Sequence, residues 1–265
     1  MLYSITFFGI ELPTYAICMY LGVALAALVA VILAKKRETV TTFDVVVSAI
    51  YTMIGAMTGA KLLYLAVSWE NVVSYIDAMG YGFWDSFFYV VNSGFVFYGG
   101  FIGGFLGLML YLWQFKRRKS DFFTIYAVVL PLGHAIGRVG CYLGGCCYGM
   151  ESDSILAVDF PIYPSLADSP VVSRLPVQLF EAVALLLLFV LLLVVYYRFT
   201  KHKTLALGVY LIVYPIIRFL LEFLRGDALR GRFLLFSTSQ WISLGILAVT
   251  GVLLYLMQQK NKTKE

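Results

Sequence analysis

Charge and histidine are both scarce in this sequence. Only 13% of its 265 residues are charged, 61% are hydrophobic, and histidine occurs twice. Because soluble domains carry about 25% charged residues, this composition excludes an ordinary water-soluble protein. The four cysteines do not form the pattern of a disulfide framework. No linker, low-complexity tract or repeat divides the chain, so we expect one integral membrane domain over residues 1–265.

Long apolar runs account for most of the chain. Several of them reach the roughly 20 residues needed to cross a bilayer core of about 30 Å. We therefore predict an all-α polytopic membrane protein with seven transmembrane helices. The predicted helices cover about residues 13–34, 43–68, 93–115, 121–143, 176–197, 204–224 and 238–257.

Basic residues gather after every second predicted helix. Cytoplasmic loops of membrane proteins are enriched in Lys and Arg, so these clusters place the N-terminus outside and the C-terminus in the cytoplasm. The net charge of +5 is then a topology signal, and we expect no nucleic-acid partner. The clusters are Lys35, Lys36 and Arg37; Lys116, Arg117, Arg118 and Lys119; Arg198, Lys201 and Lys203; and Lys260, Lys262 and Lys264.

Two segments on the predicted outer side are long enough to carry structure. Residues at about 69–92 hold interfacial aromatic side chains such as Trp69 and Trp84. Residues at about 146–175 are rich in Pro, Ser and Asp, which favours irregular structure. A shorter basic segment, which contains Arg230, follows on the same side. We expect the working face to point outward, toward anionic lipid headgroups.

The segment PLGHAIGRVGCYLGGCCYGM, residues 131–150, ends an apolar run with ionisable side chains. A charge inside a membrane normally faces protein or a watery cavity, so Arg138 is a candidate functional residue. His134 lies four residues earlier, on the same helix face, although a structural, hydrogen-bonded histidine is the common alternative. The three cysteines match no standard zinc spacing, and we predict neither a metal nor an organic cofactor.

The segment YPIIRFLLEFLRGD places Tyr214, Arg218, Glu222 and Arg225 at three- and four-residue steps. A helix stacks such residues as one polar stripe. Two arginines against one glutamate leave a positive excess, which favours an anionic ligand such as a phosphate. The alternative is a structural ion pair that ties helices together.

The segment FYGGFIGG repeats glycine at four-residue spacing, in the pairs Gly99 with Gly103 and Gly100 with Gly104. This small-xxx-small pattern lets helix backbones approach closely, and packing alone explains it. In the functional interpretation, Tyr98 presents its hydroxyl to a cavity, and the glycine backbone lets a substrate headgroup come near.

Three further polar residues lie within or at the ends of predicted helices. Lys61, in TGAKLLY, either accompanies Arg138 or snorkels to the interface. Gln178 and Glu181 open the fifth predicted helix in LPVQLFEA. Because the helix dipole favours a carboxylate near the N-terminus, Glu181 has a local explanation as well as a functional one.

Together these segments resemble the prolipoprotein diacylglyceryl transferase family. The likeness runs nearly end to end and in the family's order, through PTYAICMYLG, TGAKLLY, FYGGFIGG, GRVGCYLGGCCYG, LPVQLFE, YPIIRFLLEFLRGD and SQWISL. The resemblance implies a multi-pass enzyme of the bacterial cytoplasmic membrane. It implies transfer of a diacylglyceryl group from phosphatidylglycerol, within the lipid bilayer, to the lipobox cysteine thiol of a prolipoprotein, without a cofactor.

The resemblance also implies roles for individual residues. Arg138 and Arg218 correspond to the family's two essential arginines, which implies contact with the donor phosphate. We assign proton movement to Tyr98 and His134, and orientation of Arg218 to Glu222. The residues assigned to substrate binding are Tyr15, Lys61, Gly99, Gly100, Gly103, Gly104, Gly137, Gly140, Cys141, Gln178, Glu181, Glu222 and Arg225.

Several family positions carry other residues here. The family's histidine falls on Tyr98, its signature asparagines on Cys141 and Gly144, and its glutamate on Cys146. Thiol alkylation needs a thiolate and a stabilised phosphate leaving group, so proton removal is the step that these departures affect. His134, one turn before Arg138, is our own candidate for that step.

The departures keep other functions open. One alternative is a catalytically silent relative that binds phospholipid or lipidated peptide as an accessory protein. Another is a related lipid transferase with a different acceptor, or one in which Cys141, Cys146 or Cys147 forms a covalent intermediate beside Arg138. A transporter is least supported, because the sequence has no internal repeat with paired broken helices.

Overall fold

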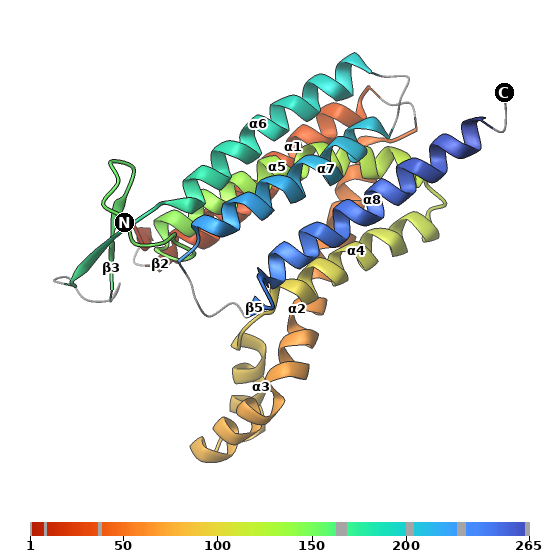
Figure 1. The fold of residues 1–265 in the computed structure, drawn as a ribbon. Coiled ribbons are helices and arrows are strands. Elements are labelled where there is room, and N and C mark those ends of the chain that lie inside the picture. Colours follow the sequence, from red (N-terminus) through yellow and green to blue (C-terminus); the bar gives the residue numbers. More distant parts are fainter. Residues whose placement is uncertain are drawn as a thin grey trace. The chain divides into compact units, whose positions relative to one another are not determined.

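A computed structural model describes residues 2–7, 10–36, 39–162, 169–199, 204–226 and 232–262. Within these ranges the regular secondary structure is helical apart from three small two-stranded antiparallel sheets (Figure 1). The helices are α1 (Thr14–Ala34), α2 (Thr42–Met79), α3 (Phe83–Asn92), α4 (Phe97–Gln114), α5 (Lys119–Leu143), α6 (Val177–Arg198), α7 (Leu205–Leu221), the 3-10 helix η1 (Glu222–Leu224) and α8 (Thr238–Lys262). The strands are β1 (Ser4–Phe7), β2 (Ile10–Pro13), β3 (Val158–Pro161), β4 (Val171–Arg174), β5 (Arg232–Phe233) and β6 (Phe236–Ser237).

Six helices of the described ranges are long and apolar enough to cross a membrane: α1, α2, α5, α6, α7 with η1, and α8. The prediction of an all-α polytopic membrane protein is therefore confirmed. Parts of the predictions lie outside the described residues, namely Arg37, Lys201, Lys203 and Lys264 of the basic clusters, Arg230, and residues 163–168 of the second outer segment.

The chain separates into two compact units. The five-helix unit comprises Met1–Leu33 and Ser120–Glu265, with α1 and α5 to α8. The three-helix unit comprises Ala34–Lys119, with α2, α3 and α4.

The structure corrects the end of the second predicted helix, which was placed at about residue 68. Helix α2 continues to Met79 and ends where Gly80 adopts a left-handed φ of 62°. No glycine or proline interrupts the chain between Trp69 and Met79, so nothing in that stretch stops the helix. Most of the first outer segment is consequently helical, formed by the end of α2 and by α3.

The second outer segment was expected to be irregular, and part of that expectation is wrong. Strands β3 and β4 pair antiparallel, with Val158 opposite Arg174 and Phe160 opposite Val172. Each strand has only four residues, which is too short for an alternating pattern to be recognised among prolines and serines. Phe160 is 2% exposed and provides the anchor that makes this hairpin part of the fold.

In the three-helix unit, glycines set the contact between α2 and α4. A methyl group added at Gly55 or Gly59 would collide with the carbonyl oxygens of Gly103 and Gly99, respectively. Gly107 meets the carbonyl of Tyr51 in the same way. The glycine repeat therefore works as a packing seam between the two helices, as the small-xxx-small pattern predicts.

A buried carboxylate fixes one end of the same unit. Asp44, 1% exposed, forms a capping box with Thr41 at the start of α2. Its Oδ1 accepts a hydrogen bond of 2.6 Å from the Tyr111 hydroxyl and lies 2.9 Å from Nη2 of Arg117. The start of α2 is thereby tied to the end of α4.

In the five-helix unit, the polar side chains gather at one end. There α1, α6 and α8 begin, and α5 and α7 finish. Tyr15 at the start of α1 packs against Gly140 of α5, and Gln178 at the start of α6 donates a hydrogen bond of 2.7 Å to the carbonyl of Cys146. Near the opposite end, Tyr196 of α6 donates a hydrogen bond of 2.9 Å to the carbonyl of Leu33.

Candidate functional site

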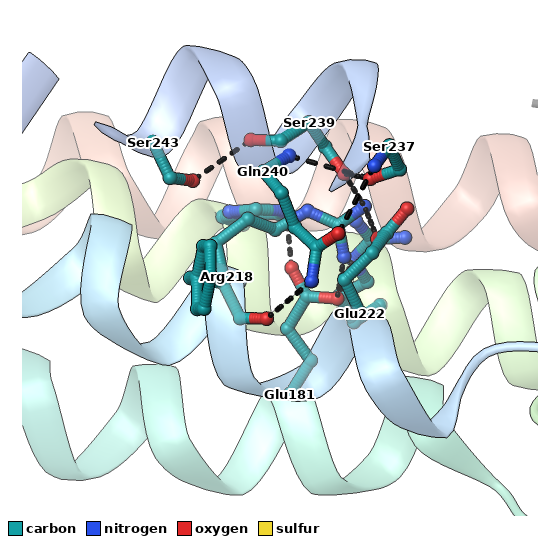
Figure 2. Close-up of polar contacts among 10 residues, drawn as sticks. Glu181, Arg218, Glu222, Ser237, Ser239, Gln240 and Ser243 are labelled. Carbon is teal, nitrogen blue, oxygen red and sulfur yellow. Dashed lines mark hydrogen bonds and ion pairs between the residues drawn. The ribbon is translucent and has the colours of Figure 1, made fainter. Parts of the chain in front are cut away.

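Glu181 is the centre of the polar cluster in the five-helix unit. Its side chain, 1% exposed, projects from the second turn of α6. Its Oε2 lies 3.1 Å from Nε of Arg138 on α5 and 3.6 Å from Nη1 of Arg218 on α7, and its Oε1 lies 3.8 Å from Nε2 of His134. One carboxylate thus joins three helices, and Figure 2 shows it pointing from α6 toward Arg218.

Arg218 has a second carboxylate partner on its own helix face. Its Nη2 lies 2.8 Å from Oε2 of Glu222, four residues later, where η1 begins. The same nitrogen donates a hydrogen bond of 3.5 Å to the Ser239 hydroxyl on α8 (Figure 2). Arg138 and Arg218 are matched in charge by Glu181 and Glu222. The positive excess predicted for the segment from Tyr214 to Arg225 is therefore carried by Arg225, which is 9% exposed.

The start of α8 presents Ser239 through a reciprocal cap. The Ser237 hydroxyl accepts a hydrogen bond of 3.3 Å from the Gln240 backbone, and the Gln240 side-chain oxygen accepts one of 3.0 Å from the Ser237 backbone. Gln240 also donates to the carbonyl of Phe219 at 3.4 Å, which links α8 to α7. The spacing Ser-x-x-Gln before an apolar run is a capping-box signal, so this cap can be recognised in the sequence.

Aromatic rings line the side of the cluster that holds His134. The imidazole meets the Tyr214 ring edge to face, with 5.7 Å between centroids. Tyr214 in turn stacks on Tyr210 at 5.5 Å. His134 therefore lies between a ring of α7 and the carboxylate of Glu181.

The cluster contains buried polar atoms that make ion pairs but no hydrogen bonds among the described residues. They include Nε of Arg138, Nη1 of Arg218 and both carboxylate oxygens of Glu181. Buried polar groups in proteins nearly always have hydrogen-bond partners, and exceptions call for a specific explanation. The cluster therefore retains hydrogen-bonding capacity that a bound polar group can use.

Three cysteines lie next to the charged cluster. The sulfurs of Cys141, Cys146 and Cys147 all lie within 4.8 Å of one another. The charge of Arg138 acts on Cys141 and Cys147, and Arg225 reaches the Cys147 thiol. Hydrogen bonds with the two other thiols, together with Arg225, hold the pKa of Cys147 below its ordinary value.

Tyr15 and two predicted glycines belong to the contact between α1 and α5. A methyl group at Gly137 would lie 3.3 Å from the Met19 sulfur, and one at Gly140 would lie 2.7 Å from the Cys18 side chain. Tyr15 remains 44% exposed at the same end of the unit as Arg138. Close helix packing explains these glycines, and their role in substrate binding stays a prediction.

The remaining predicted site residues belong to the three-helix unit. Gly99, Gly100, Gly103 and Gly104 face α2, whereas Tyr98 is 46% exposed. The contacts of the four glycines are those of helix packing, and the substrate-binding and proton-transfer roles of all five residues stay predictions.

Lys61, also in the three-helix unit, binds the end of α3. Its ammonium donates to the carbonyls of Val90, Ser93 and Gly94 at 2.9, 2.6 and 3.2 Å. A cation is favourable at a helix C-terminus, where carbonyl groups lack partners. This local role accounts for Lys61, and substrate binding by it stays a prediction.

Comparison with known proteins places these features in a family. The family model described as "Prolipoprotein diacylglyceryl transferase" matches residues 3–257. The chain is 34% identical over 261 residues to phosphatidylglycerol–prolipoprotein diacylglyceryl transferase 2 of Clostridium perfringens, covering 97% of this chain and 95% of the relative. It is 32% identical over 243 residues to the phosphatidylglycerol–prolipoprotein diacylglyceryl transferase of Clostridium tetani, covering 89% and 90%. The enzyme of that name from Campylobacter curvus is 27% identical over 270 residues, covering 98% and 95%.

Proposed function

This chain belongs to the prolipoprotein diacylglyceryl transferase family, and from that membership we propose that it transfers a diacylglyceryl group from phosphatidylglycerol to the lipobox cysteine thiol of a prolipoprotein. The observation that carries the proposal is the convergence of Arg138 and Arg218 on Oε2 of Glu181. Two guanidinium groups from different helices are thereby held together in a buried place, where a phosphodiester can be bound.

The donor headgroup is bound by the two arginines. Arg138 uses Nε toward Glu181, and a guanidinium has four further N–H groups for the phosphate oxygens. Glu222 orients Arg218 through the 2.8 Å contact, and Ser239 supports it from α8. Donors that are fixed before the reaction stabilise charge as it develops in the transition state, without a reorganisation cost.

The chemistry is a displacement at carbon. The acceptor thiol loses its proton, its sulfur attacks the glyceryl carbon, and the bond between that carbon and the phosphate oxygen breaks. The glycerol phosphate leaves with the electron pair, and its new charge faces the arginines. His134, which lies beside Glu181, and Tyr98 assist proton movement.

Family membership and the basic clusters also support a membrane topology and a cellular location for the chain. The chain forms a single domain in the bacterial cytoplasmic membrane, and α4, with 18 residues, is the seventh span. The N-terminus lies outside and the C-terminus lies in the cytoplasm. The basic clusters support this orientation. The end of the five-helix unit that contains Arg138 and Arg218 then faces outward, where exported acceptors arrive.

A transfer assay tests the proposal. Purified protein is incubated with phosphatidylglycerol and a lipobox peptide, and the peptide is examined by mass spectrometry. We expect the mass increase of a diacylglyceryl thioether on the cysteine peptide and none on a matched peptide with serine at that position. Phosphatidylglycerol binding without any thioether product would contradict the proposal and support the accessory-protein alternative. Product formed only on a different thiol would support the alternative acceptor.

A further inference from the structure

The cysteines at the end of α5 form a compact group of sulfurs that the proposed transfer chemistry has not used. Cys141 lies in the last turn of α5, and Cys146 and Cys147 follow in the connecting segment. Their three sulfurs lie within 4.8 Å of one another, whereas Cys18, the fourth cysteine, is not part of the group. The spacing of these cysteines along the sequence matches no standard zinc pattern. The turn after α5 brings their sulfurs together.

The backbone after α5 turns sharply to bring the sulfurs together. Gly145 and Cys147 both have left-handed φ angles, 64° and 65°. A non-glycine residue rarely adopts such a conformation, and when it does it is often at a functional site. On the other side, the buried Gln178 of α6 holds the Cys146 carbonyl at 2.7 Å. The arrangement is therefore held from two helices.

The dimensions suit a metal ion. A tetrahedral centre with metal–sulfur bonds of about 2.3 Å places its sulfurs about 3.8 Å apart. Separations of up to 4.8 Å come into that range through small rotations of the side chains. A disulfide, in contrast, would use two of the sulfurs and leave the third without a role.

The charges nearby also suit a thiolate-bound cation. Three thiolates and one divalent ion carry a formal charge of −1. Arg225 contacts the Cys147 thiol, and Arg138 precedes Cys141 by one turn of α5, so both positive charges offset it. Gln178 Oε1 is buried without a hydrogen bond among the described residues, which leaves an acceptor next to Cys146 for a ligand's N–H or O–H group.

We propose that Cys141, Cys146 and Cys147 bind one thiophilic metal ion, of which Zn²⁺ is the best match, and leave its fourth position open. Cys141 is buried, Cys147 is partly buried and Cys146 is exposed, so the open position faces outward from the helix end. Three protein ligands and one exchangeable position are the arrangement of catalytic rather than structural zinc sites.

The fourth coordination position of the metal binds the acceptor thiol. This role of the metal rests on the proposed transferase function. A thiol that coordinates zinc is deprotonated, and its proton passes to solvent. The thiolate electron pair then forms the bond to the glyceryl carbon, while glycerol phosphate leaves with the electrons of the broken carbon–oxygen bond. The metal thus supplies the activated thiolate in a chain where Tyr98 replaces the family's histidine.

Metal binding is tested first, on the full-length protein reduced and stripped with a chelator. We expect one Zn²⁺ per chain in competition titrations. Serine in place of Cys141, Cys146 or Cys147 should weaken binding at least about 100-fold, since even outer-shell partners cost 10- to 100-fold. Cys18→Ser is the matched control and should bind like the wild type. Less than one Zn²⁺ per wild-type chain, or unchanged affinity in Cys141→Ser, overturns the proposal.

A second measurement uses the wild-type protein alone. It therefore requires neither a correctly folded variant nor transferase activity. The wild-type protein loaded with Co²⁺ should show a sulfur-to-cobalt charge-transfer band, and a lipobox peptide with cysteine should change its visible spectrum. The serine peptide should leave the spectrum unchanged. Absence of the charge-transfer band rules out thiolate ligation, and an unchanged spectrum with the cysteine peptide rules out the open position.

The two proposals fail in different ways. Transfer that proceeds undiminished in metal-free protein overturns the role of the metal in thiol activation and leaves the transferase function intact. Protein that binds Zn²⁺ and the thiol peptide but never forms the thioether contradicts the transferase function and leaves the metal site intact.

Discussion

Glu181 Oε2 lies 3.1 Å from Nε of Arg138, so a carboxylate in the second turn of α6 neutralises the arginine that the α5 segment places inside the membrane domain. The same oxygen approaches Arg218 from α7. From the sequence, Glu181 can be explained simply as a carboxylate near a helix N-terminus. In the structure, it is the group that holds the cluster together.

Loss of the Glu181 charge should destabilise the protein. Glu181→Gln removes the carboxylate that pairs with Arg138 and leaves Arg218 with Glu222 as its carboxylate partner. Removal of one partner from a buried ion pair costs about 3–5 kcal/mol. Thermal unfolding in detergent should show a marked decrease in melting temperature. Glu151→Gln is the matched control, because Glu151 forms an ion pair with Arg174 but is 70% exposed. Equal melting temperatures for the two variants would contradict the central role of Glu181.

Arg218→Lys should keep the charge and lose most of the activity. A lysine cannot contact Glu181, Glu222 and Ser239 with one planar fork of donors. Loss of a preorganised donor costs about 10²–10³ in kcat, so we expect kcat of thioether formation to fall in that range. Arg174→Lys, which alters an arginine outside the cluster, should retain kcat. Near wild-type kcat in Arg218→Lys would remove the arginine from the proposed mechanism.

Replacement of His134 should distinguish proton movement from a structural role. If the imidazole assists proton transfer, His134→Ala and His134→Phe should both lower kcat, by about 10²- to 10⁴-fold for a full general base. Phenylalanine retains the edge-to-face contact with Tyr214, so a purely structural histidine would be largely rescued by it. Full activity in His134→Ala would eliminate the catalytic assignment.

The glycine seam between α2 and α4 should tolerate no added methyl group. In Gly103→Ala the new carbon would meet the Gly55 carbonyl, and overpacking of this kind costs about 1–3 kcal/mol. Gly245→Ala on α8 is the control, because an added methyl group there meets nothing within 4 Å. We expect the first variant to unfold at a lower temperature than the second. A higher unfolding temperature for Gly103→Ala than for Gly245→Ala would show that α2 and α4 can move apart without loss of stability.

The sequence could indicate the fold because membrane helices follow local rules. Apolar length alone located α1, α5 and α6 to within a few residues, since the bilayer requires each span to satisfy its own backbone hydrogen bonds. It placed the end of α2 too early, because hydrophobicity falls after Trp69 although helix propensity continues to Gly80. It missed strands β3 and β4, which are too short to show a pattern.

The sequence by itself determined that this is a polytopic membrane protein and that Arg138 and Arg218 need partners, because composition and the cost of a buried charge are properties of each segment alone. Only the tertiary structure decided that Glu181 is the shared partner and that three cysteines lie within 4.8 Å of one another. Residues 43 and 37 positions away from Glu181 along the chain meet there because α5, α6 and α7 pack side by side, and no local pattern specifies such a contact.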